Sequence, residues 1–359
     1  MRTPALCLLC LLCLLTPTQG RTEELIILQY HFVSDAGPDS TSVSPERFEA
    51  HLRIIEEEGL AVVDLPSALD ALSEQDALPE RAVAITFDDG YVSVYRHAFP
   101  RLAERSWPFT VFVNPEAIDN GSQAHADWAA LRDMQHAGAT IANHGMRHAF
   151  LVRRDPALPA ESDDNYAERI GAEITVAERR INAELGASHR LFAYAYGEYD
   201  SRLRQWLEAR GYRAFGQHSG VASRYADPLA LPRFPVSGPY SQTESVREKL
   251  RMGALPVLDP QALPSPTLAT EDPRPELTLS LAATDLSASS LACYASDQGR
   301  IDSVIEDAGD GRLLLTARPP QALPLGRSRY NCTGQGRDGR WRWFSQPWLR
   351  LGPGGEAPP

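Results

Sequence analysis

The sequence predicts an α/β protein built on parallel strands, followed by a small all-β domain near the C-terminus. Three observations support this prediction. Between residues 25 and 235, short apolar segments alternate with amphipathic helical segments. The apolar segments are continuous rather than alternating, as expected of parallel strands that are buried on both faces. After a proline-rich stretch, the pattern changes to short strands separated by turns.

The strands of the first region stand out as apolar runs. We expect them at Leu25–Gln29, Ala82–Phe87, Phe109–Val113, Ala139–Ala142, Leu191–Ala195 and Tyr212–Phe215. Amphipathic segments lie between them, so each strand is followed by helical sequence. This repeating order implies a parallel sheet or a barrel.

Three helices of this region have recognisable ends. The first should begin at Pro45, because Ser44 can cap it, and should stop at Gly59. A second amphipathic segment starts at Trp128 and runs to Gly138. The third and longest covers Asn165–Leu185, directly before a glycine. The helices therefore fit the gaps between the expected strands.

Composition divides the chain into four regions. Residues 1–20 contain the apolar run Ala5–Leu15 after Arg2 and predict a secretory signal, because the run is too short to cross a bilayer. We therefore expect an exported chain, periplasmic or secreted; a short uncleaved anchor is the alternative. Residues 21–250 form the main domain, 251–275 a proline-rich linker and 276–359 the small β domain. No later segment is apolar enough to span a membrane.

The small domain should consist of short strands held together by a disulfide. The strands are expected at Leu277–Leu281, Leu291–Tyr294, Arg312–Thr316, Arg329–Cys332 and Trp341–Phe344. Cys293 and Cys332 are the cysteines left after the signal, and an oxidising compartment favours their pairing. Trp341, Trp343 and Trp348 either form a small core, which we favour, or stack on sugar rings.

The overall charge argues against one class of partner. The formal net charge is −12 and the isoelectric point is about 5.3. A nucleic-acid partner requires a basic surface that displaces counterions from the phosphates. The sequence therefore predicts no nucleic-acid binding.

Polar side chains follow five of the expected strands. They are Tyr30 and His31, Asp88 and Asp89, Asn143 and His144, Tyr196 and Gly197, and finally His218. The carboxyl ends of parallel strands share one face of a βα fold, and functional sites form there. These side chains are therefore expected to meet at one rim.

Asp88, Asp89, His144 and His148 have the chemistry of a metal site. Adjacent carboxylates repel each other unless a cation lies beside them, although Asp-Asp-Gly also suits a plain turn. His144 and His148 are spaced so that both imidazoles can reach one ion. Two imidazoles and one carboxylate are the ligand set of an open catalytic zinc site, and they also suit iron, cobalt or nickel.

Three motifs resemble those of the polysaccharide deacetylase family, carbohydrate esterase family 4, also called the NodB-homology domain. The first is Thr86-Phe87-Asp88-Asp89-Gly90. The second, His144-Gly145-Met146-Arg147-His148, is similar to His-Ser/Thr-x-x-His with glycine in place of the hydroxyl residue. The third is Phe192-Ala193-Tyr194-Ala195-Tyr196-Gly197. The resemblance covers residues 25 to 240 and implies a distorted barrel of β/α units.

The resemblance implies a role for each matching residue. Asp88 would be the general base, and Asp89, His144 and His148 would be the ligands of one divalent metal ion, zinc first. The backbone N–H of Tyr196 would help to stabilise the oxyanion of the tetrahedral intermediate.

The third motif departs from the family pattern at two positions. The family often has an arginine that orients the base where this chain has Ala193, and Arg233 is the expected replacement. Ala195 stands where a proline is usual. The histidine that acts as general acid cannot be aligned directly. His218 is the preferred candidate for this acid, and His31 is the second.

Together these features predict a metal-dependent hydrolase that removes N-acetyl groups from a polysaccharide of the N-acetylglucosamine type. One alternative is an esterase or amidase that acts on another acylated substrate. The other is a non-catalytic glycan-binding protein on a deacetylase scaffold. The retained Asp88 argues against mere binding, because a binding protein has no use for a second carboxylate beside a metal.

Overall fold

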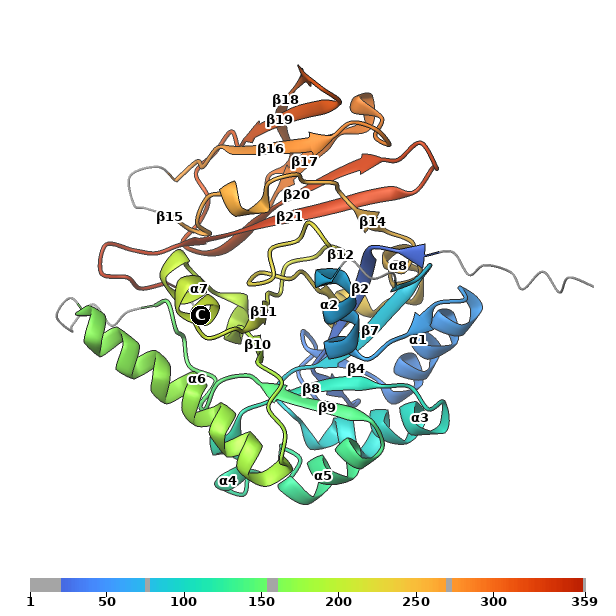
Figure 1. Ribbon diagram of the computed structural model, residues 1–359, viewed down its shortest axis with the longest axis vertical. Coiled ribbons are helices and arrows are strands. Elements are labelled where there is room, and N and C mark those ends of the chain that lie inside the picture. The colour runs from blue at the N-terminus through green and yellow to red at the C-terminus, as the bar shows by residue number, and fades with distance from the viewer. Residues whose placement is uncertain (1–20, 75–77, 154–160, 269–272, 358–359) are drawn as a thin grey trace, which may run out of the picture.

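The computed structural model describes residues 21–74, 78–153, 161–268 and 273–357. The predicted signal at residues 1–20 lies outside this part of the chain. Within it, the first domain is built on a nine-stranded sheet and the second on an eight-stranded sheet. Figure 1 shows the β domain lying along one side of the first domain.

The first sheet is mostly parallel and curls into a half-barrel. Its order is β11-β10-β9-β8-β7-β2-β12, with β13 added beside β2 and β5 beside β7. β12 alone pairs antiparallel. The strands are β2 (Glu24–Tyr30), β5 (Ala61–Val62), β7 (Ala82–Phe87), β8 (Phe109–Val113), β9 (Ala139–Asn143), β10 (Leu191–Ala193), β11 (Arg213–Phe215), β12 (Ala222–Ser223) and β13 (Phe234–Pro235). The predicted α/β fold with parallel strands is therefore confirmed.

The helices begin and end where local sequence signals place them. α1 spans Pro45–Glu57, and the Ser44 side chain accepts a hydrogen bond from the Arg47 N–H at its start. α6 spans Asp163–Leu185 and ends at Gly186, whose φ of 67° is left-handed. The others are α2 (Leu65–Ser73), α3 (Phe99–Glu104), α4 (Pro115–Asp119), α5 (Trp128–His136), α7 (Ser201–Glu208) and α8 (Thr243–Lys249).

The sequence prediction was wrong at one strand end that matters for the site. The strand expected at Leu191–Ala195 is β10 and stops at Ala193. A tight 3₁₀ turn over Ala195–Gly197 follows it. Tyr196 takes a left-handed conformation there (φ 59°), which no extended strand can accommodate.

The β domain forms around a long hairpin of β20 (Gly326–Gln335) and β21 (Trp341–Arg350). Its sheet order is β14-β21-β20-β17-β18-β19-β16, with β15 also paired to β21. The predicted disulfide between Cys293 and Cys332 is present, across the β17–β20 pair. The remaining strands are β14 (Gly253–Ala254), β15 (Thr267–Leu268), β16 (Leu277–Ala282), β17 (Ala292–Ala295), β18 (Gly299–Gly309) and β19 (Arg312–Arg318).

Two features of the β domain differ from the expected pattern. β18 was not predicted, because most of its residues are exposed and it has few apolar side chains, so it lacks the apolar signal of the other strands. β14 and β15 lie in the segment expected as linker and add to the hairpin. Short strands β1 (Arg21–Thr22), β3 (Phe32–Val33), β4 (Ser42–Val43) and β6 (Leu78–Pro79) complete the described strands.

The two domains share an apolar interface. Leu349 on β21 is 2% exposed and belongs to a core cluster with Tyr166 and Ile170 of α6. Trp343, six residues earlier on the same strand, packs edge-on against Phe234 of β13, with ring centroids 6.2 Å apart. Of the three tryptophans near the C-terminus, Trp348 is buried in the β domain and Trp341 is largely exposed.

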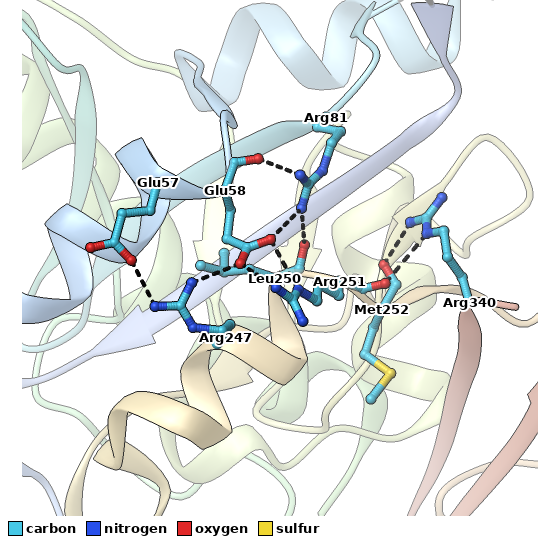
Figure 2. A network of polar contacts seen from close by, with 8 residues as sticks. All are labelled: Glu57, Glu58, Arg81, Arg247, Leu250, Arg251, Met252 and Arg340. Carbon is cyan, nitrogen blue, oxygen red and sulfur yellow. Dashed lines mark hydrogen bonds and ion pairs between the residues drawn. The ribbon is translucent and has the colours of Figure 1, made fainter.

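A cluster of arginines and glutamates joins α1, α8 and the β20–β21 hairpin (Figure 2). The Glu58 carboxylate, directly after α1, accepts hydrogen bonds from Arg81, Arg247 and Arg251. From the hairpin, Arg340 donates to the carbonyl of Met252 at 3.0 Å. No described helix is both long and apolar enough to cross a membrane.

Candidate active site

Residues that follow three strands of the parallel sheet meet at one rim of the half-barrel. Asp88 and Asp89 come after β7, His144 after β9, and Tyr196 after β10. Asp89, His144 and His148 each offer one ligand atom, and these atoms all lie within 4.8 Å of one another. The strand-end placement expected from the sequence therefore brings one carboxylate and two imidazoles together.

The three side chains have the geometry of a metal site. Asp89 Oδ1 lies 3.3 Å from His144 Nε2 and 3.4 Å from His148 Nε2. His144 is fully buried, Asp89 is 8% exposed, and His148 is partly open to solvent. One carboxylate oxygen and two imidazole nitrogens therefore lie close enough together to bind a single cation.

The orientation of His144 tests whether these residues fit a metal ion. Its Nδ1 lies 2.8 Å from the carbonyl oxygen of Ala193, which can only accept, so Nδ1 donates. Its Nε2 is buried and makes no hydrogen bond, and the Asp89 oxygen 3.3 Å away cannot donate to its lone pair. A buried nitrogen lone pair without a donor is costly, and a metal ligand held by a carbonyl through its other nitrogen has this arrangement. The residues therefore fit a divalent ion.

His148 is available as a neutral imidazole. Burial, and then the neighbouring His144, hold the pKa of His148 at about 4. An imidazole must be unprotonated to bind a metal. His148 is therefore in its ligating form at neutral pH.

Three residues of the site take left-handed backbone conformations. The φ angles are 69° at Asp89, 57° at His148 and 59° at Tyr196. Such angles are costly for residues with a side chain and persist only where the surrounding structure fixes them, often at functional sites. The backbone is thus bent at each of these positions to aim the side chain or the N–H inward.

The loop that carries His148 is held by two polar side chains. Asn114 donates to the carbonyl oxygens of His144 and Gly145, at 2.8 and 3.0 Å. Glu173 of α6 accepts from the N–H of Arg147 at 3.1 Å. Gly145, which stands where the family motif has a hydroxyl residue, has a φ of 84°, so glycine suits this position.

Asp88 is held in place by a fully buried ion pair with Arg233. Arg233 donates two parallel hydrogen bonds to the carboxylate, at 2.7 and 2.8 Å, and both side chains are 0% exposed. Burial alone would raise the pKa of Asp88, but Arg233, then His144, outweigh it and hold the pKa below its usual range. Asp88 is therefore ionised and can accept a proton.

Arg233 is itself held in place by the barrel core. Its Nε donates to the carbonyl of Gly216 at 3.0 Å, and its guanidinium lies 5.4 Å from the ring centre of Phe112. The arginine expected to replace the one missing at Ala193 thus reaches Asp88 from the segment before β13.

Comparison with known proteins identifies the domain that carries this geometry. Residues 75–215 match the family model for polysaccharide deacetylase. The chain contains a polysaccharide deacetylase domain. This match confirms the family resemblance expected from the three motifs.

Known relatives of the deacetylase domain include YxkH of Bacillus subtilis, a candidate polysaccharide deacetylase, which is 27% identical over 60% of this chain and 72% of its own length. The poly-β-1,6-N-acetyl-D-glucosamine N-deacetylase of Escherichia coli K12 is 23% identical over 55% of this chain. That match spans only 34% of the E. coli protein.

Two solved structures share the fold of the deacetylase domain. The Streptococcus pyogenes deacetylase PplD, in complex with acetate, is 21% identical, with a TM-score of 0.56 over 63% of this chain and 98% of that one. IcaB from Ammonifex degensii is 26% identical, with a TM-score of 0.54 over 65% of this chain and 98% of that one.

The two candidate histidines for the general acid lie in different places on the half-barrel. His31, directly after β2, has its Nε2 3.9 Å from Asp88 Oδ2 and is 17% exposed. His218 lines the cavities between the deacetylase and β domains, and its ring centre is 6.4 Å from that of Tyr199. No contact of the described residues joins His218 to Asp88 or Asp89. The structure therefore brings His31, not His218, to the carboxylates.

Two residues of the half-barrel contact the carboxylates but were not predicted from the sequence. Gln29 is the second-to-last residue of β2 and is buried, and its amide donates to Asp88 at 2.6 Å. Tyr91 lies against Asp89 and stacks on Phe32, with ring centroids 3.6 Å apart. A polar residue inside an otherwise apolar strand was the available signal for Gln29. For Tyr91, the sequence offered no signal other than its position directly after Asp-Asp-Gly.

Proposed function

We propose that this chain is a metal-dependent hydrolase that removes N-acetyl groups from a polysaccharide of the N-acetylglucosamine type. The observation that carries the proposal is the pairing of Asp88 and Asp89. One carboxylate points to two imidazoles, and the other is held ionised by Arg233 at 2.7 Å. A site that only bound a metal or a sugar would not need the second, buried carboxylate.

The proposed metal is held by Asp89, His144 and His148, with zinc as the first choice and iron, cobalt or nickel as alternatives. A divalent ion there would polarise an amide carbonyl and lower the pKa of water to about 7. The chain supplies the rest of the chemistry.

Asp88 is placed to take the proton of the attacking water. Its two bonds to Arg233 and one to Gln29 occupy the carboxylate edge that faces the barrel. Fixing the base in this way reduces the reorganisation needed during reaction. The N–H of Tyr196, at the bent turn after β10, is the proposed donor to the oxyanion.

A second group must give a proton to the departing amine. We assign this role to His31 rather than His218, because His31 lies 3.9 Å from Asp88. An imidazole can exchange a proton near neutral pH, which suits a general acid. Burial lowers the pKa of His31, although Asp88 opposes this shift.

The substrate class is inferred from relatives. One of them is named for the deacetylation of poly-β-1,6-N-acetyl-D-glucosamine, and this chain is 23% identical to it. We therefore propose an N-acetylglucosamine polymer as the substrate. Export to the periplasm or cell exterior, expected from residues 1–20, would bring the protein to such a polymer.

The test is acetate release from purified protein incubated with a panel of N-acetylated and O-acetylated glycans, with and without a chelator. We expect release from an N-acetylglucosamine polymer, loss with chelator and recovery when a divalent metal is returned. Release only from O-acetylated substrates would favour an esterase. Binding without release from any substrate in metal-loaded protein would favour a glycan-binding protein.

A further inference from the structure

One residue of the β domain reaches the active-site turn of the deacetylase domain. The Nη1 of Arg327, on β20, donates to the carbonyl oxygen of Tyr196 at 2.9 Å. The guanidinium also lies 5.8 Å from the centre of the Tyr196 ring. A residue 131 positions away in sequence therefore contacts the peptide next to the proposed oxyanion donor.

The Tyr196 turn needs such support. Tyr196 has a φ of 59° and a ψ of 2°, a conformation that costs free energy for a residue with a side chain. The Gly197 that follows is also left-handed, at φ 71°. Relaxation of Tyr196 to a negative φ would rotate its N–H relative to its carbonyl group and turn the N–H away. A hydrogen bond that holds the Tyr196 carbonyl oxygen opposes this rotation.

The side chain of Tyr196 is held by aromatic contacts that do not involve its backbone. Its ring stacks on Phe150, with centroids 3.8 Å apart and an angle of 13°, and contacts His148 edge-on at 4.4 Å. The ring alone does not fix the peptide plane, because the backbone can rotate about the Cα while the ring stays packed. Arg327 supplies the missing constraint.

Arg327 is held by both domains. Its Nε lies 3.8 Å from Glu198, a buried carboxylate that is also bound by Arg153. Arg327 pairs across the hairpin with Leu349, which is buried in a core cluster of the deacetylase domain. The backbone that carries the guanidinium is therefore anchored to the surface that it contacts.

We propose that Arg327 is a positioning residue: it holds the Tyr196 peptide so that the neighbouring N–H faces the reacting carbonyl, and the β domain thereby completes the active site. The catalytic part of this inference rests on the proposed deacetylase function. The conformational part does not, because it concerns the backbone at Tyr196 whatever the reaction.

The test compares Arg327→Ala with Arg327→Lys and a matched control. Arg329→Ala removes an arginine from the same face of the same strand, and the guanidinium of Arg329 donates to the hydroxyl of Tyr240 instead. In metal-loaded protein with a short N-acetylglucosamine oligomer, Arg327→Ala should lower kcat by about 10- to 100-fold, which is less than the roughly 10²- to 10³-fold loss when an oxyanion donor is removed. KM and bound metal should change less than about threefold. Arg327→Lys should recover part of kcat, since lysine can still donate.

Hydrogen exchange supplies a readout that does not depend on activity. Amides in the peptide covering residues 194–199 should exchange faster in Arg327→Ala, with no change in Arg329→Ala or in peptides of the β domain. Unchanged exchange at 194–199, or an effect on KM alone, would overturn the inference. If the wild-type protein releases no acetate from any glycan, the proposed function fails, and exchange still decides whether Arg327 holds the turn.

Discussion

At the scale of single residues, the proposed mechanism assigns metal binding and proton transfer to two different carboxylates. Asp89 faces the imidazoles, while Asp88 is turned toward Arg233 and Gln29. The two are adjacent in sequence, and the left-handed φ of 69° at Asp89 turns their side chains to different partners. Mutations at the two positions should therefore have different effects.

The metal prediction concerns Asp89 and His148. Asp89→Ala and His148→Ala should each lose bound metal, because two remaining ligands hold a divalent ion far less tightly than three. Metal content after dialysis is the measurement. His136→Ala, which changes an exposed histidine of α5, should keep its metal. Full occupancy in both site variants would contradict the assignment.

The base prediction concerns Asp88. Asp88→Asn should keep its metal and lose activity by roughly 10²- to 10⁴-fold, the usual contribution of a general base. Metal content and steady-state acetate release, measured on the same sample, check the two halves separately. Near-normal turnover would exclude Asp88 as the base.

The acid prediction compares His31→Ala with His218→Ala. An amide substrate needs its leaving amine protonated, whereas an activated aryl ester does not. His31→Ala should lower kcat on the amide by roughly 10²-fold or more and spare the ester. His218→Ala should affect both substrates alike. The reverse pattern would return the role to His218.

The residues of the site were predictable to different degrees. Asp88, Asp89, His144 and His148 could be found because they follow strands whose ends meet by topology. Gln29 was missed because a strand's burial pattern does not say which polar side chain turns inward. Arg327 could not be found, because its contact with Tyr196 depends on how the two domains pack. The sequence around either residue does not indicate this packing.

At the scale of elements, β7 and β8 begin and end at the predicted residues, because both are short, apolar and fully buried. Less regular elements were harder to predict. The prediction continued β10 into the turn that follows it, because nothing in Leu191–Ala195 indicates a left-handed residue. β18 was missed because an exposed strand in the middle of a sheet is defined by its neighbours' hydrogen bonds rather than by its own apolar residues.

The contact between α1 and α8 should depend on pH through Glu58. Hydrogen bonds from Arg251 first, and then from Arg247 and Arg81, lower the pKa of Glu58 to about 2 from an ordinary value of 4.5. Since the folded state binds the ionised form, this stabilisation is present above pH 4.5 and is lost as the pH falls toward 2. Glu58→Gln should lower the free energy of unfolding at pH 7 by about 1–2 kcal/mol.

Urea unfolding at pH 7 and at pH 3 measures this effect. The difference between wild type and Glu58→Gln should shrink at the lower pH. Glu57→Gln is the matched control, because Glu57 is 58% exposed and is paired to Arg247 in Figure 2 without the other two arginines. An equal, pH-independent effect of both variants would contradict the prediction.

At the scale of the whole molecule, the β domain and the half-barrel share a core cluster and should unfold together. Leu349→Ala leaves a cavity between the domains and should lower the free energy of unfolding by about 2–4 kcal/mol. Calorimetry and circular dichroism should still show one transition, shifted to lower temperature. Leu325→Ala, at a β-domain leucine that is 44% exposed, should shift it little. Two separate transitions in wild type would show independent domains.

The position of β21 in the chain has a consequence for synthesis. β21 comes later than every other described strand, yet β14, β15 and β20 all pair with it, and its Leu349 and Trp343 cover apolar residues of the half-barrel. Until residues 341–350 have emerged, the nascent chain has one flank of its barrel uncovered and three strand edges unpaired. Exposed apolar surface and free edges are the features that chaperones bind and that aggregation exploits. A chain shortened to residue 335 should therefore remain in this vulnerable state, and its Tyr196 turn should lie beside a β20 strand that lacks its partner.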